Sequence, residues 1–205
     1  MTTILWRGAR PLLLASTSPT RRGLLEGAGF SVETAAPGVD ERAVEAACAG
    51  LVPEALAERL AEAKAGAVAA RHSDRVVIGA DQVLACEGTL FHKPADLASA
   101  RDQIAALAGR THALHAAVSL AIDGSIVETF VETAHLTMRR LDARQIAAYV
   151  ALAGADKVRA SVGGYQLEGL GIHLFSEIAG DHSTILGLPL LPLLARLRDR
   201  GLLGF

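Results

Sequence analysis

Apolar residues along this chain occur in two patterns that follow one another from about residue 11 onward. Short continuous apolar runs bounded by turn residues are typical of buried strands, and apolar positions three to four residues apart are typical of helices. The alternation predicts an α/β fold with a mixed twisted sheet flanked by helices. Neither a repeat nor a long Gly/Ser/Pro linker interrupts it, which favours a single domain over residues 1–205, with room for two lobes around a cleft.

Local signals place the individual elements. The predicted strands are residues 11–15, 30–36, 75–85, 111–122, 125–138 and 172–178. The predicted helices are residues 19–28, 53–72, 96–108, 142–153 and 188–200. Asp123-Gly124 lies between two long strands and is a strong hairpin signal. Ser18 and Asp142 suit the N-cap positions of the helices that follow them.

Charge and cysteine content exclude several classes of function. The 205 residues carry 20 Lys+Arg and 22 Asp+Glu, which gives a formal net charge of -2. No broad basic field is therefore available to attract nucleic acid or an anionic membrane. Cys48 and Cys86 lie far apart without a CxxC pair, which indicates neither a disulfide framework nor a Cys-based zinc site. The apolar run 11–15 is too short for a signal peptide, so we expect a cytoplasmic protein.

The segment Ser16-Thr-Ser-Pro-Thr-Arg-Arg22 is a hydroxyl-rich turn between a strand and a helix. Free backbone N–H groups at a helix start attract anions, and an arginine guanidinium can donate two parallel hydrogen bonds to the oxygens of one phosphate. The turn therefore predicts an anion site whose polar groups are Ser16, Ser18, Arg21 and Arg22. A capped helix with solvated arginines is the alternative, because serine is a common N-cap.

Asp81 and Gln82 interrupt the apolar strand predicted at residues 75–85. A buried carboxylate is costly unless it is paired or bound to a metal. Asp81 could therefore hold a divalent metal or act as a general base toward water. Gly79 indicates a close backbone approach, as a ligand site would require. The alternative is a strand end at which Asp81 caps a turn.

The segment Gly163–Gly171 contains four glycines around Gln166 and Glu168. Close backbone around a carboxylate suits a loop that lines a ligand site. An ordinary Gly-rich turn is the alternative. His112 and His115 form an HxxH pattern, but their odd spacing on a strand sends the two rings to opposite faces, which argues against a zinc pair.

Four further charged residues are candidates. Lys64 lies at the edge of the buried face of the helix at residues 53–72 and could point into a cleft. Lys93 follows the aspartate-bearing strand after a short turn, where it could lie near that carboxylate or be solvated. Asp40 and Glu41 follow a Pro-Gly pair in a loop, where they could supply oxygen ligands to a metal or form a solvated acidic loop.

Together these segments resemble the Maf family. The matching stretches are Leu14–Arg22, Ile78–Gln82, Lys93-Pro94, Ala108–Thr111, Glu168–Gly171, Gly180–Ser183 and Gly187–Pro189. Each is weak alone, but their order over nearly the whole chain is specific. The resemblance implies a fold shared with the inosine triphosphate pyrophosphatases. It also implies hydrolysis of a nucleoside triphosphate to the monophosphate and pyrophosphate, a divalent metal (Mg²⁺ or Mn²⁺), and a homodimer as one compatible state.

The resemblance also implies roles for single residues. By position, Asp81 would accept a proton, and Glu41 would lie with it at the metal. The triphosphate would be bound by Ser16, Arg21, Lys64 and Lys93. These implied roles agree with the chemistry of phosphoryl transfer, which depends on positioning, charge neutralisation and activation of water.

Three positions of the family are linked to base choice, and here they are Thr20, Gln82 and Glu168. Members that act on dTTP and UTP typically show Arg, Thr and Gln, whereas Gln82 and Glu168 resemble the branch that acts on 7-methyl-GTP. A carboxylate accepts hydrogen bonds from the guanine N1–H and amine. Thr20 fits neither pattern, because the guanine branch tends to place a large aromatic residue there. A dTTP/UTP or broad-specificity enzyme is the alternative, and a nucleotide-binding regulator of septum formation is the alternative of another class.

Overall fold

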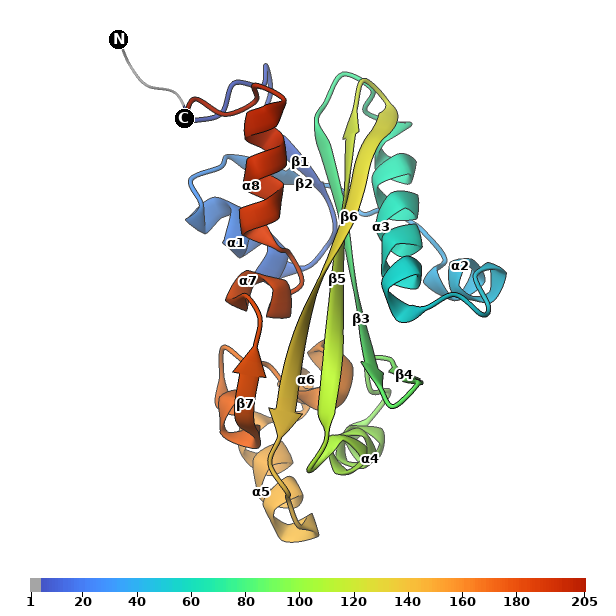
Figure 1. Cartoon of the computed structure of the whole chain (residues 1–205), viewed down its shortest axis with the longest axis vertical. Helices are drawn as coiled ribbons and strands as arrows, with labels where there is room; N and C mark the ends of the chain where they lie inside the picture. Colours follow the sequence, from blue (N-terminus) through green and yellow to red (C-terminus); the bar gives the residue numbers. More distant parts are fainter. Residues whose placement is uncertain (1–4) are drawn as a thin grey trace. The chain divides into compact units, whose positions relative to one another are not determined.

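The computed structural model describes residues 5–205 as a mixed α/β fold. Its seven-stranded sheet has the order β2-β1-β3-β5-β6-β7, with β4 paired to β3 (Figure 1). The strands are β1 Leu12–Ala15, β2 Val32–Thr34, β3 Val77–Cys86, β4 Thr89–Phe91, β5 Thr111–Ile122, β6 Ser125–Met138 and β7 Phe175–Ala179. The helices are α1 Pro19–Gly27, α2 Glu41–Ala47, α3 Pro53–Ala69, α4 Leu97–Leu107, α5 Ala143–Ala153, α6 Ala155–Ala160, α7 His182–Ile185 and α8 Leu190–Asp199, with 3-10 turns η1 Val162–Gly164 and η2 Leu170–Leu174. The predicted fold class is confirmed.

Strand pairing shows why the sheet is mixed. Strand β1 pairs in parallel with β2 and with β3. Strands β4 and β7 run antiparallel to β3 and β6. The predicted hairpin is present between β5 and β6, where Asp123 and Gly124 have φ angles of 51° and 77°. Two consecutive positive φ angles are what a two-residue hairpin turn requires, so this local signal placed both long strands correctly.

The chain folds into two compact units. Unit 1 consists of residues 5–82, Ala116–Glu132 and His182–Phe205, and unit 2 consists of Val83–His115 and Thr133–Asp181. The divisions fall inside β3, β5 and β6, so each of these strands contributes residues to both units. Within residues 5–205, no helix combines the length and the apolar character needed to cross a membrane.

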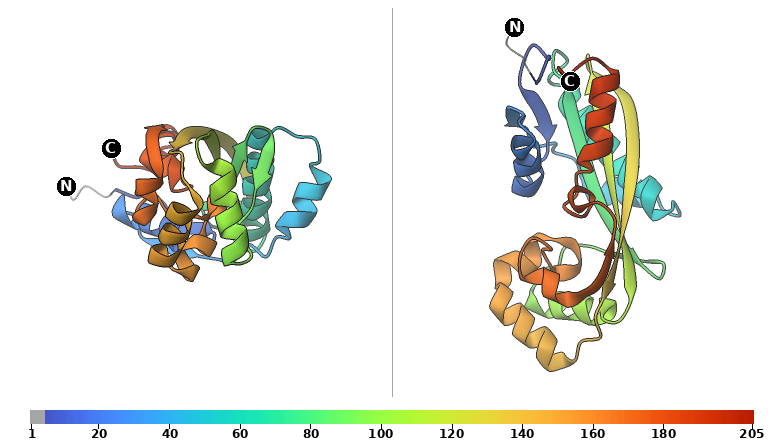
Figure 2. Two further views of the ribbon diagram at one scale, coloured as in Figure 1. Left: turned by 90° about the horizontal axis from the view of Figure 1, so that it is seen from below. Right: turned by 60° about the vertical axis from the view of Figure 1, so that its left-hand side comes forward.

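In unit 1, helices cover both faces of the sheet. Leu12 and Leu14 of β1 pack in one core with residues of α1 and α8, whereas Leu13 and Ala15 pack in another with residues of α3. Figures 1 and 2 show α1 and α8 on one side of the strands and α3 on the other. Successive strand residues point to opposite faces, so this pattern decides which layer each polar residue of β3 meets.

Helix α3 lies unusually close to β3 at Gly79. A Cβ atom there would lie 2.5 Å from the backbone nitrogen of Ala65 and would collide with the carbonyl oxygen of Ala61. The sequence predicted a close approach of backbone at Gly79, and this is confirmed. Its assignment to a ligand site is wrong. The backbone that approaches is that of α3, and the missing side chain is what allows the helix to pack there.

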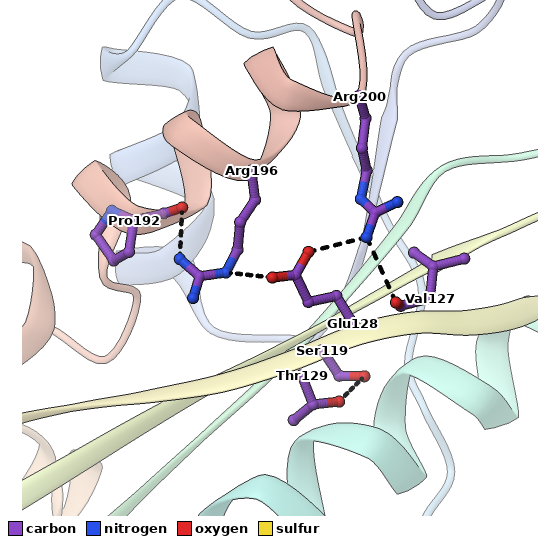
Figure 3. A network of polar contacts seen from close by, with 7 residues as sticks. All are labelled: Ser119, Val127, Glu128, Thr129, Pro192, Arg196 and Arg200. Atoms are coloured by element: carbon purple, nitrogen blue, oxygen red, sulfur yellow. Dashed lines mark hydrogen bonds and ion pairs between the residues drawn. The ribbon is translucent and has the colours of Figure 1, made fainter.

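An acidic residue of β6 forms ion pairs with two arginines at the C-terminal end of helix α8 (Figure 3). The Glu128 carboxylate accepts hydrogen bonds from Arg196 Nε at 2.8 Å and from Arg200 Nη2 at 2.9 Å. The Arg196 guanidinium also lies 3.8 Å from the ring centroid of Phe130. Partial burial acts to raise the pKa of Glu128, but the bonds from both arginines outweigh it and hold that pKa below its ordinary value.

Several element boundaries differ from the sequence prediction. The strand predicted at residues 30–36 is reduced to the three residues of β2, and the strand predicted at 172–178 begins only at Phe175, after η2. Asp40 and Glu41 were predicted in a loop, which is wrong. Asp40 is the N-cap of α2, its side chain accepting a 3.1 Å hydrogen bond from the backbone nitrogen of Ala43, and Glu41 begins the helix. Short apolar runs and helices as short as the seven residues of α2 carry too little periodicity to be placed by pattern.

Candidate functional site

The serine-rich turn joins β1 to α1 in unit 1. Ser16 is buried, and its hydroxyl oxygen accepts a 3.1 Å hydrogen bond from the backbone nitrogen of Ser18. The Ser18 hydroxyl in turn accepts a 3.4 Å bond from the backbone nitrogen of Arg21, which confirms the predicted N-cap. Both hydroxyls are therefore held at the positive end of α1, where an anion is favoured.

Arg21 and Arg22 differ sharply in environment. Arg21 donates from Nε to the carbonyl of Gly187 at 2.8 Å and from Nη1 to the carbonyl of Ala80 at 2.9 Å. Desolvation lowers the pKa of Arg21, and the nearby carboxylates act to raise it. Arg22 is exposed, and its Nε lies 2.7 Å from Glu26 Oε1. For Arg22 this matches the alternative of a capped helix with solvated arginines. The two bonds of Arg21 use Nε and Nη1, so the Nη2 edge of the guanidinium is left to meet an anion.

Lys64 lies between two carboxylates. Its Nζ is paired with Asp81 Oδ1, and it lies 2.6 Å from Glu41 Oε1. The side chains of Lys64 and Asp81 are 8% and 10% exposed, whereas that of Glu41 is 59% exposed. Lys64 was predicted at the edge of the apolar face of its helix, and it is one of the buried residues of α3, as are Leu60 and Ala61. Asp81 is thus paired with a cation of helix α3 and does not cap a turn.

The two carboxylates suit a divalent cation only in part. Magnesium in proteins is commonly held by one or two carboxylates together with oxygens of the substrate phosphates. Asp81 and Glu41 match that kind of donor set, and Lys64 holds them near one another. Among the described residues, no group of three or more His, Cys, Asp or Glu side chains is placed to hold a metal ion.

Gln82 is used to hold a distant segment. Its Nε2 donates to the carbonyls of Thr184 and Ile185, at 3.1 and 3.0 Å. The reverse amide orientation would face its oxygen toward two carbonyl oxygens, so the network fixes Oε1 as the atom left for a ligand. The sequence predicted a base-contacting role for Gln82 and missed this structural one, because 102 positions separate Gln82 from Thr184.

The remaining candidates belong partly to unit 1 and partly to unit 2. Thr20 is half-buried in the first turn of α1, within unit 1. Lys93 and Glu168 both belong to unit 2, where both are exposed. Unit 1 therefore contains Ser16 and Ser18 in the turn between β1 and α1, Thr20 and Arg21 on α1, Glu41 on α2, Lys64 on α3, and Asp81 and Gln82 on β3.

Comparison with known proteins identifies the family. The model of the family described as Maf-like protein matches residues 11–200. The chain belongs to the Maf family. The resemblance inferred from the sequence is therefore confirmed, and the Maf match includes every candidate residue named above.

Relatives of this Maf chain carry two kinds of name. A protein of Nitrobacter hamburgensis named nucleoside triphosphate pyrophosphatase is 52% identical over 97% of this chain and 98% of its own length. A protein of Rhizobium johnstonii named 7-methyl-GTP pyrophosphatase is 50% identical over 93% of this chain and 96% of its own. A protein of Brucella abortus biovar 1 with the same name is 51% identical over 91% and 94%. The relatives thus agree on pyrophosphatase and differ in the substrate that is named.

One solved structure also resembles the Maf chain. It is a nucleoside-triphosphatase (dITP/XTP pyrophosphatase) of Mycobacterium abscessus, with a TM-score of 0.39 and 20% identity over 64% of this chain and 76% of that one. The Maf fold of this chain is defined by the strand order and pairing given above.

Proposed function

We propose that this chain hydrolyses nucleoside triphosphates to the nucleoside monophosphate and pyrophosphate. The names of full-length relatives at about half identity support this class of reaction. The structural observation that carries it is the buried Lys64, which is paired with Asp81 and Glu41. Two carboxylates and a lysine in this arrangement provide a proton acceptor and a cation at one place, which hydrolysis at phosphorus requires.

Asp81 acts as the proton acceptor for the attacking water. Its carboxylate is buried and oriented by Lys64, so a free lone pair can be aimed at water with little reorganisation. A positioned general base contributes roughly 10²- to 10⁴-fold to a rate. Arg21 is held by two backbone carbonyls and would meet the triphosphate with its remaining N–H groups, beside the Ser16 and Ser18 hydroxyls. In this proposal Lys64 and Lys93 also bind the triphosphate.

A divalent metal, Mg²⁺ or Mn²⁺, forms part of this proposal. Glu41 and Asp81 would hold it, since carboxylate oxygens are its preferred protein ligands and triphosphate oxygens can complete the shell. The chemistry it supplies is neutralisation of phosphate charge and polarisation of the phosphoryl oxygens. Lys64 would keep the two carboxylates from repelling one another before substrate binds.

We infer a preference for 7-methyl-GTP from two hydrogen-bond acceptors. The Gln82 amide nitrogen is occupied by Thr184 and Ile185, so Gln82 offers a ligand its oxygen. Glu168 offers a carboxylate. Guanine presents N1–H and amine donors that acceptors can bind, and a methylated cationic ring is further attracted by a carboxylate. The names of two relatives support this substrate, while a dTTP/UTP or broad-specificity enzyme is the alternative that Thr20 leaves open.

A substrate panel tests the proposal. The purified chain is incubated with Mg²⁺ or Mn²⁺ and 7-methyl-GTP, GTP, UTP, dTTP or ATP, and monophosphate and pyrophosphate are measured. We expect Asp81→Asn to lower kcat by at least about 100-fold. The matched control is Asp74→Asn, which removes an exposed carboxylate paired with Arg10 and should leave kcat unchanged.

Each outcome of the panel has a distinct meaning. Faster turnover of 7-methyl-GTP supports both the reaction and the base preference. Faster turnover of UTP or dTTP keeps the reaction and overturns the preference. Tight nucleotide binding with no turnover would reject catalysis and favour a nucleotide-binding regulator of septum formation.

A further inference from the structure

Unit 2 contains a cluster of three rings, two buried and one half-buried, that the proposed chemistry does not use. His112 of β5 and Tyr165, which follows η1, are 1% and 4% exposed. A 2.6 Å hydrogen bond joins His112 Nε2 and the Tyr165 hydroxyl. Phe175 packs edge-on against Tyr165, with ring centroids 4.8 Å apart, and lies 5.8 Å from the His112 ring. Tyr165 is therefore held by a hydrogen bond and by ring packing at once.

His112 is costly to bury, because only one of its two ring nitrogens is hydrogen-bonded within residues 5–205. Its Nδ1 atom has no hydrogen-bond partner among the described residues. Burial lowers the pKa of His112 to about 4, so the ring is neutral near pH 7. A buried ring nitrogen without a partner costs stability, which suggests that the bond to Tyr165 has a use beyond packing.

The backbone just before Tyr165 is fixed at two consecutive glycines. Gly163 and Gly164 have φ angles of 77° and 75°, a conformation that other residues rarely adopt. The Gly163 nitrogen donates to Gln103 Oε1 at 3.2 Å, and the Gly164 carbonyl accepts a 3.3 Å bond from the Tyr149 hydroxyl. The chain thus reaches Tyr165 along a constrained path.

The backbone just after Tyr165 forms a closed turn. The Gln166 carbonyl accepts hydrogen bonds from the nitrogens of Gly169 and Gly171, at 3.2 and 3.1 Å. A Cβ at Gly171 would collide with that same carbonyl oxygen. Glu168 lies inside this turn and is exposed, three residues beyond the buried tyrosine ring. The buried ring of Tyr165 therefore anchors the start of the turn that presents Glu168.

We propose that His112 and Tyr165 are positioning residues for base selection, because their hydrogen bond fixes the turn that carries Glu168. This inference rests on the proposed function, in which Glu168 meets the base. Neither residue touches the substrate in this proposal. Loss of the bond should loosen the turn and weaken recognition of the base, while the phosphate-binding groups of unit 1 stay as they are.

Tyr165→Phe is the variant that separates this role from packing. It keeps the ring beside Phe175 and removes only the hydroxyl. Thr133→Val is the matched control, since it removes a hydroxyl bonded at 2.9 Å to another buried histidine of β5, His115. A general loss of unit 2 packing would affect both variants, whereas positioning of the turn is specific to Tyr165→Phe.

Two measurements test the proposal. Hydrogen exchange should become at least about 10-fold faster at the Gly169 and Gly171 amides in Tyr165→Phe and stay unchanged in Thr133→Val, because about 1.4 kcal/mol of lost local stability is a factor of ten. In steady-state kinetics, KM for 7-methyl-GTP should rise about as much, with kcat little changed. KM for GTP should rise less, because GTP lacks the cationic ring that the Glu168 carboxylate attracts, so the ratio of kcat/KM for 7-methyl-GTP to that for GTP should fall. In a Glu168→Gln background, Tyr165→Phe should leave that ratio unaltered.

The outcomes separate this inference from the proposed function. Unchanged exchange at Gly169 and Gly171 in Tyr165→Phe would overturn the anchoring, whatever the activity. Equal effects of Tyr165→Phe and Thr133→Val on exchange would mean that the His112–Tyr165 hydrogen bond contributes only to general packing. That result would also overturn the anchoring. A wild-type chain that turns over no triphosphate would reject the proposed function, and base selection with it, while the exchange experiment still reads the anchoring directly.

Discussion

The ammonium of Lys64 is paired with the carboxylate of Asp81 beneath helix α3, where their side chains are only 8% and 10% exposed. A buried pair of this kind adds little net stability, because desolvation of both ions offsets their attraction. Removal of one partner is a different matter, since it leaves the other charge buried without compensation. The pair is therefore better explained by the proposed reaction than by folding.

Lys64→Met should both inactivate and destabilise the protein. The substitution leaves Asp81 buried without its cation and beside Glu41, and the expected loss in the free energy of unfolding is about 3 kcal/mol. Urea unfolding measures it. Adding Asp81→Asn should restore part of that stability, because the uncompensated charge is gone. Arg10→Met, which breaks an exposed pair with Asp74, should cost less than about 1 kcal/mol. Equal stability of Lys64→Met and wild type would contradict this view of the pair.

Gly79→Ala should displace α3 and with it Lys64. The added Cβ would meet the backbone of α3 at Ala61 and Ala65, which can move only by shifting the helix. We expect a loss of about 2 kcal/mol or more in unfolding free energy, as for other overpacked interiors. Gly66→Ala is the matched control, since that glycine lies within α3 with open space around it. It should stabilise the helix by about 0.5–1 kcal/mol. If Gly66→Ala lowered the unfolding free energy and Gly79→Ala left it unchanged, the proposed close packing of α3 on Gly79 would be wrong.

Gln82→Glu should weaken the segment that carries Thr184 and Ile185. The new carboxylate would face two carbonyl oxygens and could donate to neither, at a cost of about 1–3 kcal/mol. Thermal unfolding at pH 8 reports the change. Gln145→Glu is a matched control, because Gln145 Oε1 accepts a 2.9 Å bond from the backbone nitrogen of Asp142 and a carboxylate accepts it equally well. The prediction fails if the two variants unfold at the same temperature.

Local and long-range features differ in how far the sequence predicts them. The β5–β6 hairpin matches its prediction at both ends, because Asp123-Gly124 and the long apolar runs are complete signals within the segment itself. The cap at Ser18 is a local signal of the same kind. The site is different: nothing near Lys64 in the sequence indicates Glu41 as a partner, because the contact depends on how α2 and α3 pack.

Polar residues inside apolar segments were the most informative sequence signal. Asp81 stood out because a carboxylate in an apolar strand needs a partner, and the structure supplies one. Gln82 stood out for the same reason, although its donors are used by backbone carbonyls. The HxxH spacing of His112 bears only on a zinc pair, and no pattern in the sequence links His112 to Tyr165, 53 positions away. Such pairings follow from tertiary packing and are invisible to local periodicity.

His112 should make stability fall as the pH drops below neutrality. Its pKa in the folded chain is about 4, against an ordinary value of 6.5, so between these values the unfolded chain binds a proton that the folded chain does not. Stability is therefore lost as the pH falls from about 6.5, and the loss levels off near pH 4 at about 3 kcal/mol. His112→Gln keeps a group able to bond Tyr165 and removes the titration. The unfolding free energy of wild type relative to His112→Gln should fall by about 2 kcal/mol between pH 7 and pH 5, measured by urea unfolding. Groups common to both proteins cancel in that difference, so a constant difference over this range would mean that His112 is not buried in its neutral form.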